Sequence, residues 1–491
     1  MAYFYDRLSA MDNTFLLSET PTTPMHVTAV EIFEAGPLRT AAGGIDSARI
    51  RAAYAGALHR IPRYRQRLTW IPIENRPVWV DDPDFNLDYH VRHVSLPRPG
   101  GEAELRRVVS RIIATHLDRR RPLWEIWVVE GLDHDRFAII AKTHHCMLDG
   151  SAGVEAAQIL LSPSPDAEVE EPEPWTPRPM PTPQQLALDE AWRYATLPLR
   201  AVRGWREFRD EVEDVGAEIE ARARALGEFF TSTTSMASDT PINGPLSPHR
   251  RFDWLGMSLA DVKAVRRKLG CTVNDVFLAT VTGACREYLQ GRGVALDDIA
   301  FRASTPVSLR AEDDHSQAGN RVSSWFVELP VGEADRKAEI EAIHAETRRL
   351  KESRQAMGME MLMAAAEVAP SGIVGLGVGM ASGPINIIVT NVPGPQFPLY
   401  MLGGRMLALI PQVPLIENIG LGIALMSYDG RVFWGFTADY ELVPDLEHFV
   451  ELIEDSFAEL AELAGVDVSR SSRGDVSIQG ELLPAAEGAG R

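Results

Sequence analysis

The chain has 491 residues, which leaves room for two to four domains at roughly 100–200 residues each. Hydrophobic residues make up 45% of it and charged residues 24%, a composition typical of globular proteins that bury a large core. The net charge of -20 disfavours non-specific binding to nucleic acid, because the phosphate backbone would be repelled. Three cysteines without framework spacing, Cys146, Cys271 and Cys285, disfavour disulfides and fit a reducing compartment.

The first half of the chain begins without the basic and apolar regions of a secretory signal. It ends in a predicted β-hairpin, made of the β-rich runs 122–131 and 136–143, and a helix expected over residues 150–161. Residues 162–183 contain eight prolines and four glutamates, a composition that gives an extended linker rather than a core. The Arg- and Glu-rich residues 184–229 that follow predict a pair of connecting helices.

The second half opens on two consecutive helices whose ends are marked in the sequence. Ser258 caps a helix over residues 259–269, and Gly270 ends it. Thr272 opens the next helix, and Asp275 three residues later completes the arrangement of a capping box.

Strands and one Gly-rich stretch complete the second half. Residues 368–404 lack charge, but their prolines and asparagines disfavour a membrane-spanning helix, so we predict a buried Gly-rich helix and then a central strand. The alternative is that this stretch forms a surface that binds at the membrane–water interface. A hairpin turned by Asp429-Gly430 precedes a helix with apolar residues at helical spacing, 446–460. Strands are predicted at residues 299–307, 323–329, 386–392, 419–428 and 431–437.

Residues 144–150 (HHCMLDG) form an HHxxxDG pattern directly after the apolar run 137–141. If the strand continues through both histidines, their side chains point to opposite faces, so one faces the reaction and the other supports it. Asp149 is placed to cap the next helix or to pair with an arginine. Because an imidazole titrates near neutrality, it can accept a proton from an alcohol that attacks a carbonyl. The pattern therefore indicates a general-base site.

Other interpretations of the pattern stay open on the residues alone. The sequence has no GxSxG motif, which favours direct transfer over a covalent intermediate. Cys146 is a rival nucleophile, although a small buried cysteine is the more common role. Metal binding through His144, His145 and Asp149 is disfavoured, because adjacent histidines on a strand diverge and no HExxH motif accompanies them, so no metal is expected. A purely structural motif is the remaining alternative.

Further motifs occur in a fixed order across nearly the whole chain. HHxxxDG alone is shared with condensation domains and plant acyltransferases, whereas the full set is far more specific. Together the motifs resemble the bacterial wax ester synthase/acyl-CoA:diacylglycerol acyltransferase family, within the larger set of CoA-dependent acyltransferases. The matching segments are 9–16 (SAMDNTFL), 24–27 (PMHV), 122–125 (PLWE), 144–150 (HHCMLDG), 272–276 (TVNDV), 306–310 (PVSLR) and 391–395 (NVPGP).

The resemblance implies an α+β fold of two chloramphenicol-acetyltransferase-like domains, with mixed β-sheets flanked by helices and an active-site tunnel between them. It implies a long-chain acyl-CoA donor and a diacylglycerol or fatty alcohol acceptor, so the product is triacylglycerol or a wax ester. No cofactor is expected beyond acyl-CoA as co-substrate. The expected domains are residues 1–161, which carry HHxxxDG, and 241–468, joined by the linker and helices of 162–240 and followed by a polar tail at 469–491.

The resemblance also implies roles for the site residues. His145 would remove the proton of the acceptor hydroxyl, while His144 and Asp149 would hold the geometry. Asn274 lies in the first turn of its helix, where backbone N–H groups favour negative charge, so it is a candidate for an oxyanion or CoA contact. A helix-start residue without a catalytic part is the equal alternative for Asn274. Gly150 supports the turn, and the candidates to pair with Asp149 are Arg65, Arg67 and Arg310.

Two other functions stay open beside acyl transfer to a lipid acceptor. One is a condensation-type or polyketide-ester acyltransferase, and the other is a non-catalytic acyl-lipid binding protein of the same fold. The expected location is the cytoplasm, with the inner membrane face or lipid bodies as peripheral sites. At a net charge of -20, attachment there would depend on apolar surface and on local arginines, such as those of 59–67 and 119–121, which fit solvated positions equally well.

Overall fold

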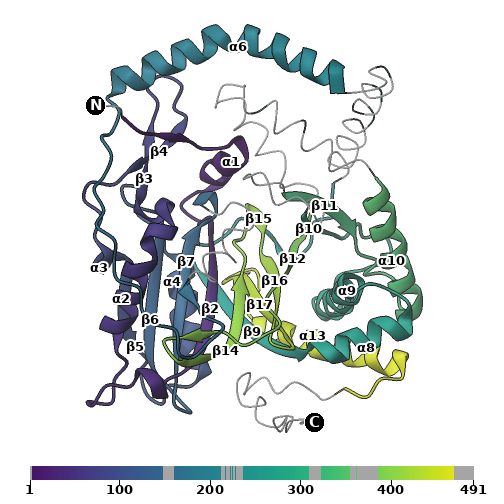
Figure 1. The fold of residues 1–491 in the computed structure, drawn as a ribbon. Coiled ribbons are helices and arrows are strands. Elements are labelled where there is room, and N and C mark those ends of the chain that lie inside the picture. Colours follow the sequence, from purple (N-terminus) through teal and green to yellow (C-terminus); the bar gives the residue numbers. More distant parts are fainter. Residues whose placement is uncertain are drawn as a thin grey trace, which may run out of the picture.

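The computed structural model describes residues 3–147, 160–211, 236–308, 322–353 and 385–468, with a few single residues between these ranges. Within them, two six-stranded mixed sheets form two halves, the first on the left of Figure 1 and the second in its centre and right. The predicted α+β class with mixed sheets flanked by helices is therefore confirmed.

The first sheet runs in the order β13-β14-β2-β7-β6-β5. Its centre includes the predicted hairpin, β6 and β7, which pair in antiparallel fashion. β5 is parallel to β6, whereas β2 and β14 are antiparallel to their neighbours, so the sheet is mixed. The strands are β2 (His26–Glu34), β5 (Val91–Ser95), β6 (Trp124–Leu132), β7 (Arg136–His144), β13 (Tyr400–Met401) and β14 (Gly404–Gln412).

The second sheet runs in the order β11-β10-β12-β16-β17-β9. β12 lies between β10 and β16 and is parallel to both, as expected for a central strand in a stretch without charged residues. β16 and β17 form the predicted hairpin around Asp429-Gly430. The strands are β9 (Arg250–Ser258), β10 (Arg302–Ser308), β11 (Val322–Glu328), β12 (Ile387–Pro393), β16 (Leu421–Tyr428) and β17 (Arg431–Asp439).

Helices cover the outer face of the second sheet, on the right of Figure 1. The predicted caps of the first two are confirmed: Ser258 and Gly270 bound α8, and Thr272 and Asp275 form the capping box of α9. The helices of this half are α8 (Leu259–Leu269), α9 (Val273–Gly291), α10 (Arg336–Glu352) and α13 (Leu446–Ala464); those of the first half are α1 (Ala10–Ser18), α2 (Ser47–Ala57), α3 (Leu87–His90) and α4 (Glu102–Ala114).

Two small sheets lie at the margins of the large ones. Three short strands, β1, β4 and β3, pair in that order in the first half, and β8 pairs with β15 in the second. Their bounds are β1 (Asp6–Arg7), β3 (Gln66–Trp70), β4 (Pro77–Asp81), β8 (Asn243–Gly244) and β15 (Asn418–Ile419).

The second sheet is buried on both faces. Along β9, Trp254 joins the core of the first half, whereas its neighbour Leu255 joins the core formed with the helices. This alternation follows from the two-residue period of a strand. The two halves therefore share an apolar contact made by one face of the second sheet.

A strand from the C-terminal part of the sequence completes the first sheet, which the sequence did not predict. β14 pairs along β2 and also passes against β17 of the second sheet. At this crossing a Cβ on Gly435 would lie 1.7 Å from the carbonyl oxygen of Pro411. Glycine is required at this position because any side chain would push the two sheets apart.

The linker is extended, as its composition predicted, and it lies along the first half. Arg178 in the linker donates to Asp81 of β4 at 2.7 Å, and Glu170 pairs with Arg60 at 3.3 Å. It leads into α6 (Pro183–Glu211), a single 29-residue helix across the top of Figure 1. The second member of the predicted helix pair falls mostly outside the described residues.

Three other sequence predictions fall wholly or mainly on residues that the structure does not describe. They are the helix over 150–161, the Gly-rich helix that precedes β12 and the polar tail. Among the helices that are described, none is both long enough and apolar enough to cross a membrane. The domain boundaries at residues 161, 240 and 468 stay predictions.

The crossing of β14 and β17 gives a test of how tightly the halves are packed. Gly435→Ala should lower the free energy of unfolding by about 1–3 kcal/mol, because the added methyl group overpacks the contact with Pro411. Urea denaturation of the full chain measures this. Gly291→Ala is the matched control, since its Cβ would meet nothing within 4 Å and alanine suits a helix end better than glycine. Equal midpoints for the two variants would contradict the packing argument.

Candidate active site

The two histidines of HHxxxDG lie at a change of backbone structure rather than within one strand. β7 ends at His144, and His145 begins a short 3-10 turn, η4 (His145–Met147). The premise that the strand continues through both residues is therefore wrong, because the chain turns as soon as the ladder with β2 ends. The two side chains still occupy different surroundings: that of His144 is fully buried and that of His145 is partly buried.

The His144 ring has a defined orientation and tautomer. Its Nδ1 accepts a hydrogen bond from the backbone N–H of Cys146 at 3.2 Å. An imidazole nitrogen that accepts carries no proton, so the proton of the neutral ring is on Nε2. Nε2 faces the carboxylate oxygen Oε1 of Glu19 at 3.5 Å. The ring therefore links a buried carboxylate to the backbone just after His145.

Glu19 lies in the site and was missed by sequence reasoning. It lies at the C-terminal cap of α1, and its side chain is almost fully buried. Arg119 donates to Oε2 through Nε at 2.9 Å and Nη2 at 2.6 Å, and His26 Nε2 lies 3.4 Å from Oε1. Burial alone would raise the pKa of the Glu19 carboxyl, but its close contacts with His144 and His26 outweigh burial and hold that pKa well below its usual range. Glu19 is thus a permanent anion.

The sheet register explains why His26 and His144 meet. They are directly opposite each other in the β2–β7 ladder and lie on the same face of the sheet. Two residues earlier on β7, Lys142 donates to the carbonyls of Ile112 and Thr115 at the end of α4. This contact satisfies helix-terminal carbonyls and fixes β7 against α4, and so fixes the position of the motif.

His145 is held by an aromatic residue of α1. Its ring stacks on Phe15 with centroids 3.7 Å apart and planes 16° from parallel. Phe15 and Glu19 are four residues apart, so the end of α1 contacts both rings of the motif. Burial lowers the pKa of His145 to about 4, although interaction with its own main chain raises it slightly. At neutral pH this ring is therefore uncharged.

A second set of metal-type ligands appears in place of the one considered from sequence. Atoms of Glu19, His26 and His144 lie within 4.8 Å of one another, whereas the set weighed and disfavoured from the sequence was His144, His145 and Asp149. The guanidinium of Arg119 already supplies a positive charge to Glu19 at hydrogen-bond distance. We assign this cluster to the positioning of His144.

Cys146, the rival nucleophile, lies in surroundings that disfavour that role. Its side chain is buried, and burial raises the pKa of its thiol well above the usual value, with the negative charges of Asp12 and Glu19 acting in the same direction. The reactive form of cysteine is the thiolate, so a neutral buried thiol is a poor nucleophile.

The remaining predicted site residues have different outcomes. Asp149, Gly150 and Arg310 lie outside the described residues. The guanidinium of Arg65 lies over the ring of Trp175, 4.9 Å from its centroid, and Nε of Arg67 lies 3.5 Å from Oδ1 of Asp82. The pairing of either arginine with Asp149 stays a prediction. Within the basic cluster 119–121, Arg119 pairs with Glu19, while Arg120 and Arg121 pair with Asp118.

Asn274 and its neighbour Asp275 occupy the first turn of α9. Asn274 is partly buried and stays a candidate for an oxyanion or CoA contact. Asp275 is fully buried, and it accepts from His344 Nδ1 at 2.8 Å and from Thr347 Oγ1 at 2.7 Å. Beyond the predicted capping box, Asp275 therefore fastens α9 to α10.

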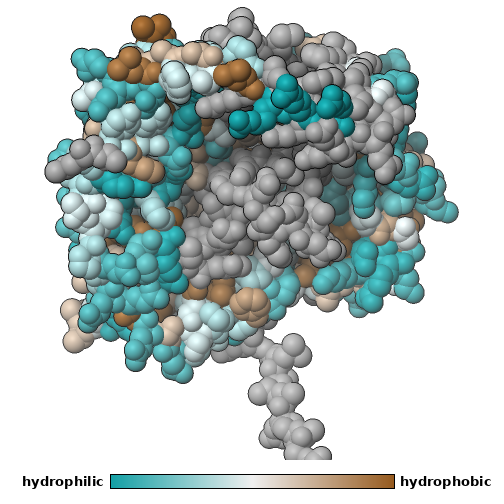
Figure 2. Space-filling view, turned by 45° about the horizontal axis from the view of Figure 1, so that its top comes forward, coloured by the Kyte–Doolittle hydropathy of each residue, from teal (hydrophilic) through white to brown (hydrophobic). Residues whose placement is uncertain are grey.

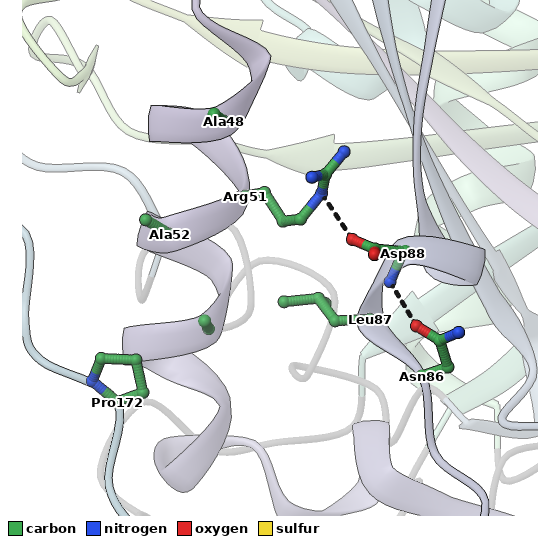
Figure 3. A pocket seen from close by; sticks show the side chains of 8 residues that line it. Ala48, Arg51, Ala52, Asn86, Leu87, Asp88 and Pro172 are labelled. Carbon is green, nitrogen blue, oxygen red and sulfur yellow. Dashed lines mark hydrogen bonds and ion pairs between the residues drawn. The ribbon is translucent and has the colours of Figure 1, made fainter.

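An open hollow of about 430 Å³ lies between α2 and α3 (Figure 3). Its polar feature is an ion pair between Arg51 Nε and Asp88 Oδ1 at 3.0 Å, and none of the predicted catalytic residues contributes to its wall. We assign it no part in the chemistry. The lining residues are Ala48, Arg51, Ala52, Ala55, Asn86, Leu87, Asp88 and Pro172.

Solved structures define the class of fold. The chain superposes on the trichothecene 15-O-acetyltransferase TRI3 of Fusarium sporotrichioides with a TM-score of 0.62 and 12% identity, covering 93% of this chain and 95% of that one. It superposes on the first condensation domain of the calcium-dependent antibiotic synthetase with a TM-score of 0.56 and 17% identity, over 95% and 98% of the two chains. The fold is thus that of the two-lobed acetyltransferases and condensation domains.

Closer relatives identify the family. Residues 8–277 match the wax ester synthase/diacylglycerol acyltransferase catalytic domain, and residues 318–461 match the C-terminal domain of the same family. The Mycobacterium tuberculosis (strain H37Rv) protein named "Probable diacyglycerol O-acyltransferase tgs1" is 33% identical over 438 residues, which are 88% of this chain and 92% of that one. The wax ester synthase/diacylglycerol acyltransferase from Marinobacter aquaeolei VT8 is 25% identical, with a TM-score of 0.65 over 94% and 100% of the chains. The chain belongs to the wax ester synthase/diacylglycerol acyltransferase family, as its motifs predicted.

The contact between Glu19 and His144 can be tested by one substitution. In Glu19→Gln the charge is lost, and an amide that donates to Nε2 would move the ring proton to Nδ1, where it opposes the N–H of Cys146. We expect kcat to fall about 10–100-fold with little change in KM, as for other residues that orient a reacting group.

Steady-state kinetics of Glu19→Gln, together with its Tm, provide the measurement. Glu328→Gln is the matched control, because Glu328 is an exposed, ion-paired carboxylate on β11 and its loss should leave both values unchanged. Full activity of Glu19→Gln would show that the charge of Glu19 has no part in positioning the motif.

Proposed function

We propose that this enzyme passes a long-chain acyl group directly from acyl-CoA to the hydroxyl of diacylglycerol or a fatty alcohol, with His145 as the general base. The product is triacylglycerol or a wax ester. The observation that carries the assignment of His145 is its geometry: the ring lies at the turn after β7, stacked on Phe15, and is uncharged at neutral pH.

The reaction needs one proton acceptor and no covalent enzyme intermediate. Nε2 of His145 takes the hydroxyl proton as the acceptor oxygen bonds to the thioester carbonyl carbon. The C–S bond then breaks, and the imidazolium returns the proton to the CoA sulfur. Ester and free CoA leave, and His145 is neutral again. Because the depressed pKa keeps the ring unprotonated, the whole enzyme population is competent at neutral pH.

The surrounding residues position this base. Glu19 keeps the His144 proton on Nε2, so that Nδ1 accepts from Cys146 and holds the turn in which His145 lies. Phe15 restricts the rotation of the His145 ring from the other side. Asp149 and Gly150 complete the motif, and Asn274 is the candidate to stabilise the oxyanion or a CoA group from the first turn of α9.

We further propose that the enzyme works at a lipid surface. Its acceptors are insoluble in water, so they are concentrated in membranes or lipid bodies. A peripheral location at the inner membrane face or a lipid body supplies them without a membrane-spanning helix. Acyl-CoA is a co-substrate, and no resident cofactor is part of the proposal.

The general base is tested by His145→Ala. With palmitoyl-CoA and either dioleoylglycerol or hexadecanol, we expect kcat to fall about 10²–10⁴-fold, the usual contribution of general-base catalysis. Release of free thiol and formation of ester are measured together.

The exposed histidine variant His448→Ala is the control for loss of an imidazole and should keep wild-type rates. Acyl-CoA binding without thiol release by the wild-type protein would instead indicate a binding protein. If His144→Ala abolished turnover while His145→Ala retained it, the assignment of the two rings would be reversed.

The pH dependence of kcat/KM follows from the pKa of His145 in the free enzyme. A general base is active when it is deprotonated, so activity is lost as pH falls through its pKa. Since burial lowers that pKa to about 4, kcat/KM should stay within about twofold between pH 8 and pH 5.5. Initial rates at acceptor concentrations well below KM across this range provide the measurement, with samples returned to neutral pH to check that the protein has stayed folded. A midpoint near 6.5 would show an unperturbed histidine as the base.

A further inference from the structure

Helix α6 is buried along one face and carries exposed apolar side chains on the opposite face. Leu186 and Glu190 are buried against the first half. The side chains of Leu188, Trp192 and Leu199 are 70%, 71% and 72% exposed. At 3.6 residues per turn these three lie within about 40° of one another around the helix. They form a stripe of apolar side chains that folding of the chain leaves exposed to water.

A second exposed apolar element lies in the hairpin of β3 and β4, on which α6 packs. In the turn between β3 and β4, Ile73 is fully exposed and has a φ of 71°, while Trp70 at the end of β3 is 39% exposed. A β-branched residue is strained in the left-handed region of backbone conformation. Because the Ile73 side chain is exposed to water, no packing energy offsets this strain. Ile73 is thus both strained and exposed, a combination that indicates a contact with something outside the folded chain.

The hairpin and α6 are joined rigidly. Tyr194 of α6 donates to Glu74 of the turn at 3.1 Å, and Leu186 packs with Ile71 and Val78. The two exposed elements therefore move as one body. Figure 2 shows apolar side chains gathered at the upper left of the molecule, where Figure 1 places the first part of α6.

The exposed stripe becomes basic towards the end of α6. Arg203 and Arg206 follow Leu199 by four and seven residues, so they lie on the same side of the helix, and both are exposed. This local positive charge contrasts with the net charge of -20 of the whole chain. Apolar side chains followed by arginines on one face match the two layers of an anionic phospholipid surface.

We propose that the α6 patch, consisting of Trp70, Ile73, Leu188, Trp192 and Leu199, inserts into a phospholipid surface with Arg203 and Arg206 on its headgroups. The proposal rests on the proposed function, which requires access to a lipid-phase acceptor. A protein partner fits less well, because a stable protein–protein interface takes roughly 20–30 residues a side, whereas the patch offers five protruding side chains. Tryptophan is also a preferred residue at the membrane–water boundary.

Vesicle flotation of the full chain tests the patch. The wild-type protein should bind vesicles of phosphatidylcholine and phosphatidylglycerol, and Trp192→Gln/Leu199→Gln should reduce the partition coefficient about tenfold or more. Leu463→Gln, which removes an exposed leucine from α13, is the matched control and should bind like the wild type. Arg203→Gln/Arg206→Gln should lose affinity mainly for the anionic vesicles.

Ile73→Asn separates docking from folding. Asparagine tolerates the left-handed conformation, so this variant should keep or raise the Tm while vesicle binding falls. Unchanged vesicle binding in both Ile73→Asn and the α6 double variant would overturn the proposal. So would a wild-type protein that fails to bind vesicles but self-associates through the patch in sedimentation velocity. Turnover of hexadecanol dispersed in detergent should be the same in all patch variants, and its absence in the wild type would refute the proposed function, whereas vesicle binding decides the patch.

Discussion

A single buried negative charge organises the site. Glu19 has its carboxylate in the interior, where an ion without partners is strongly destabilising. Arg119 and His144 provide the partners, and they come from a loop after α4 and from the end of β7. The charge therefore fixes three distant parts of the chain relative to one another. The geometry of the proposed base depends on this arrangement, since the ring that faces Glu19 also holds the turn that carries His145.

The electrostatics of the two histidines divide their roles. Both rings are neutral because burial lowers the pKa of each, and among the described residues the permanent anion Glu19 faces His144. A carboxylate favours the protonated form of an adjacent imidazole. Because the Glu19 carboxylate faces the supporting ring, its charge fixes the orientation and tautomer of His144. The stacked Phe15 orients His145 without adding charge.

The local features of this protein could be predicted from its sequence, whereas the contacts between distant segments could not. The cap of α8 at Ser258 and the turn at Asp429-Gly430 depend on neighbouring residues, and both were predicted. Glu19 and Arg119 are 100 residues apart, and no local pattern joins them. The motif 24–27 contained a usable signal, because a histidine opening a strand next to the motif strand would lie opposite His144. The helix α6 was expected, but its composition did not reveal which face would be buried.

The position of β14 has a consequence for biosynthesis. Until residues 404–412 have left the ribosome, β2 has an unpaired edge, and an exposed edge strand invites pairing with other chains. The nascent first half must therefore wait through most of translation before its sheet is complete. Chains arrested before this point would carry the entire histidine motif and still lack the strand that closes the sheet beside it. This topology therefore requires that a chaperone protect the unpaired edge of β2, or that the second half be synthesised rapidly.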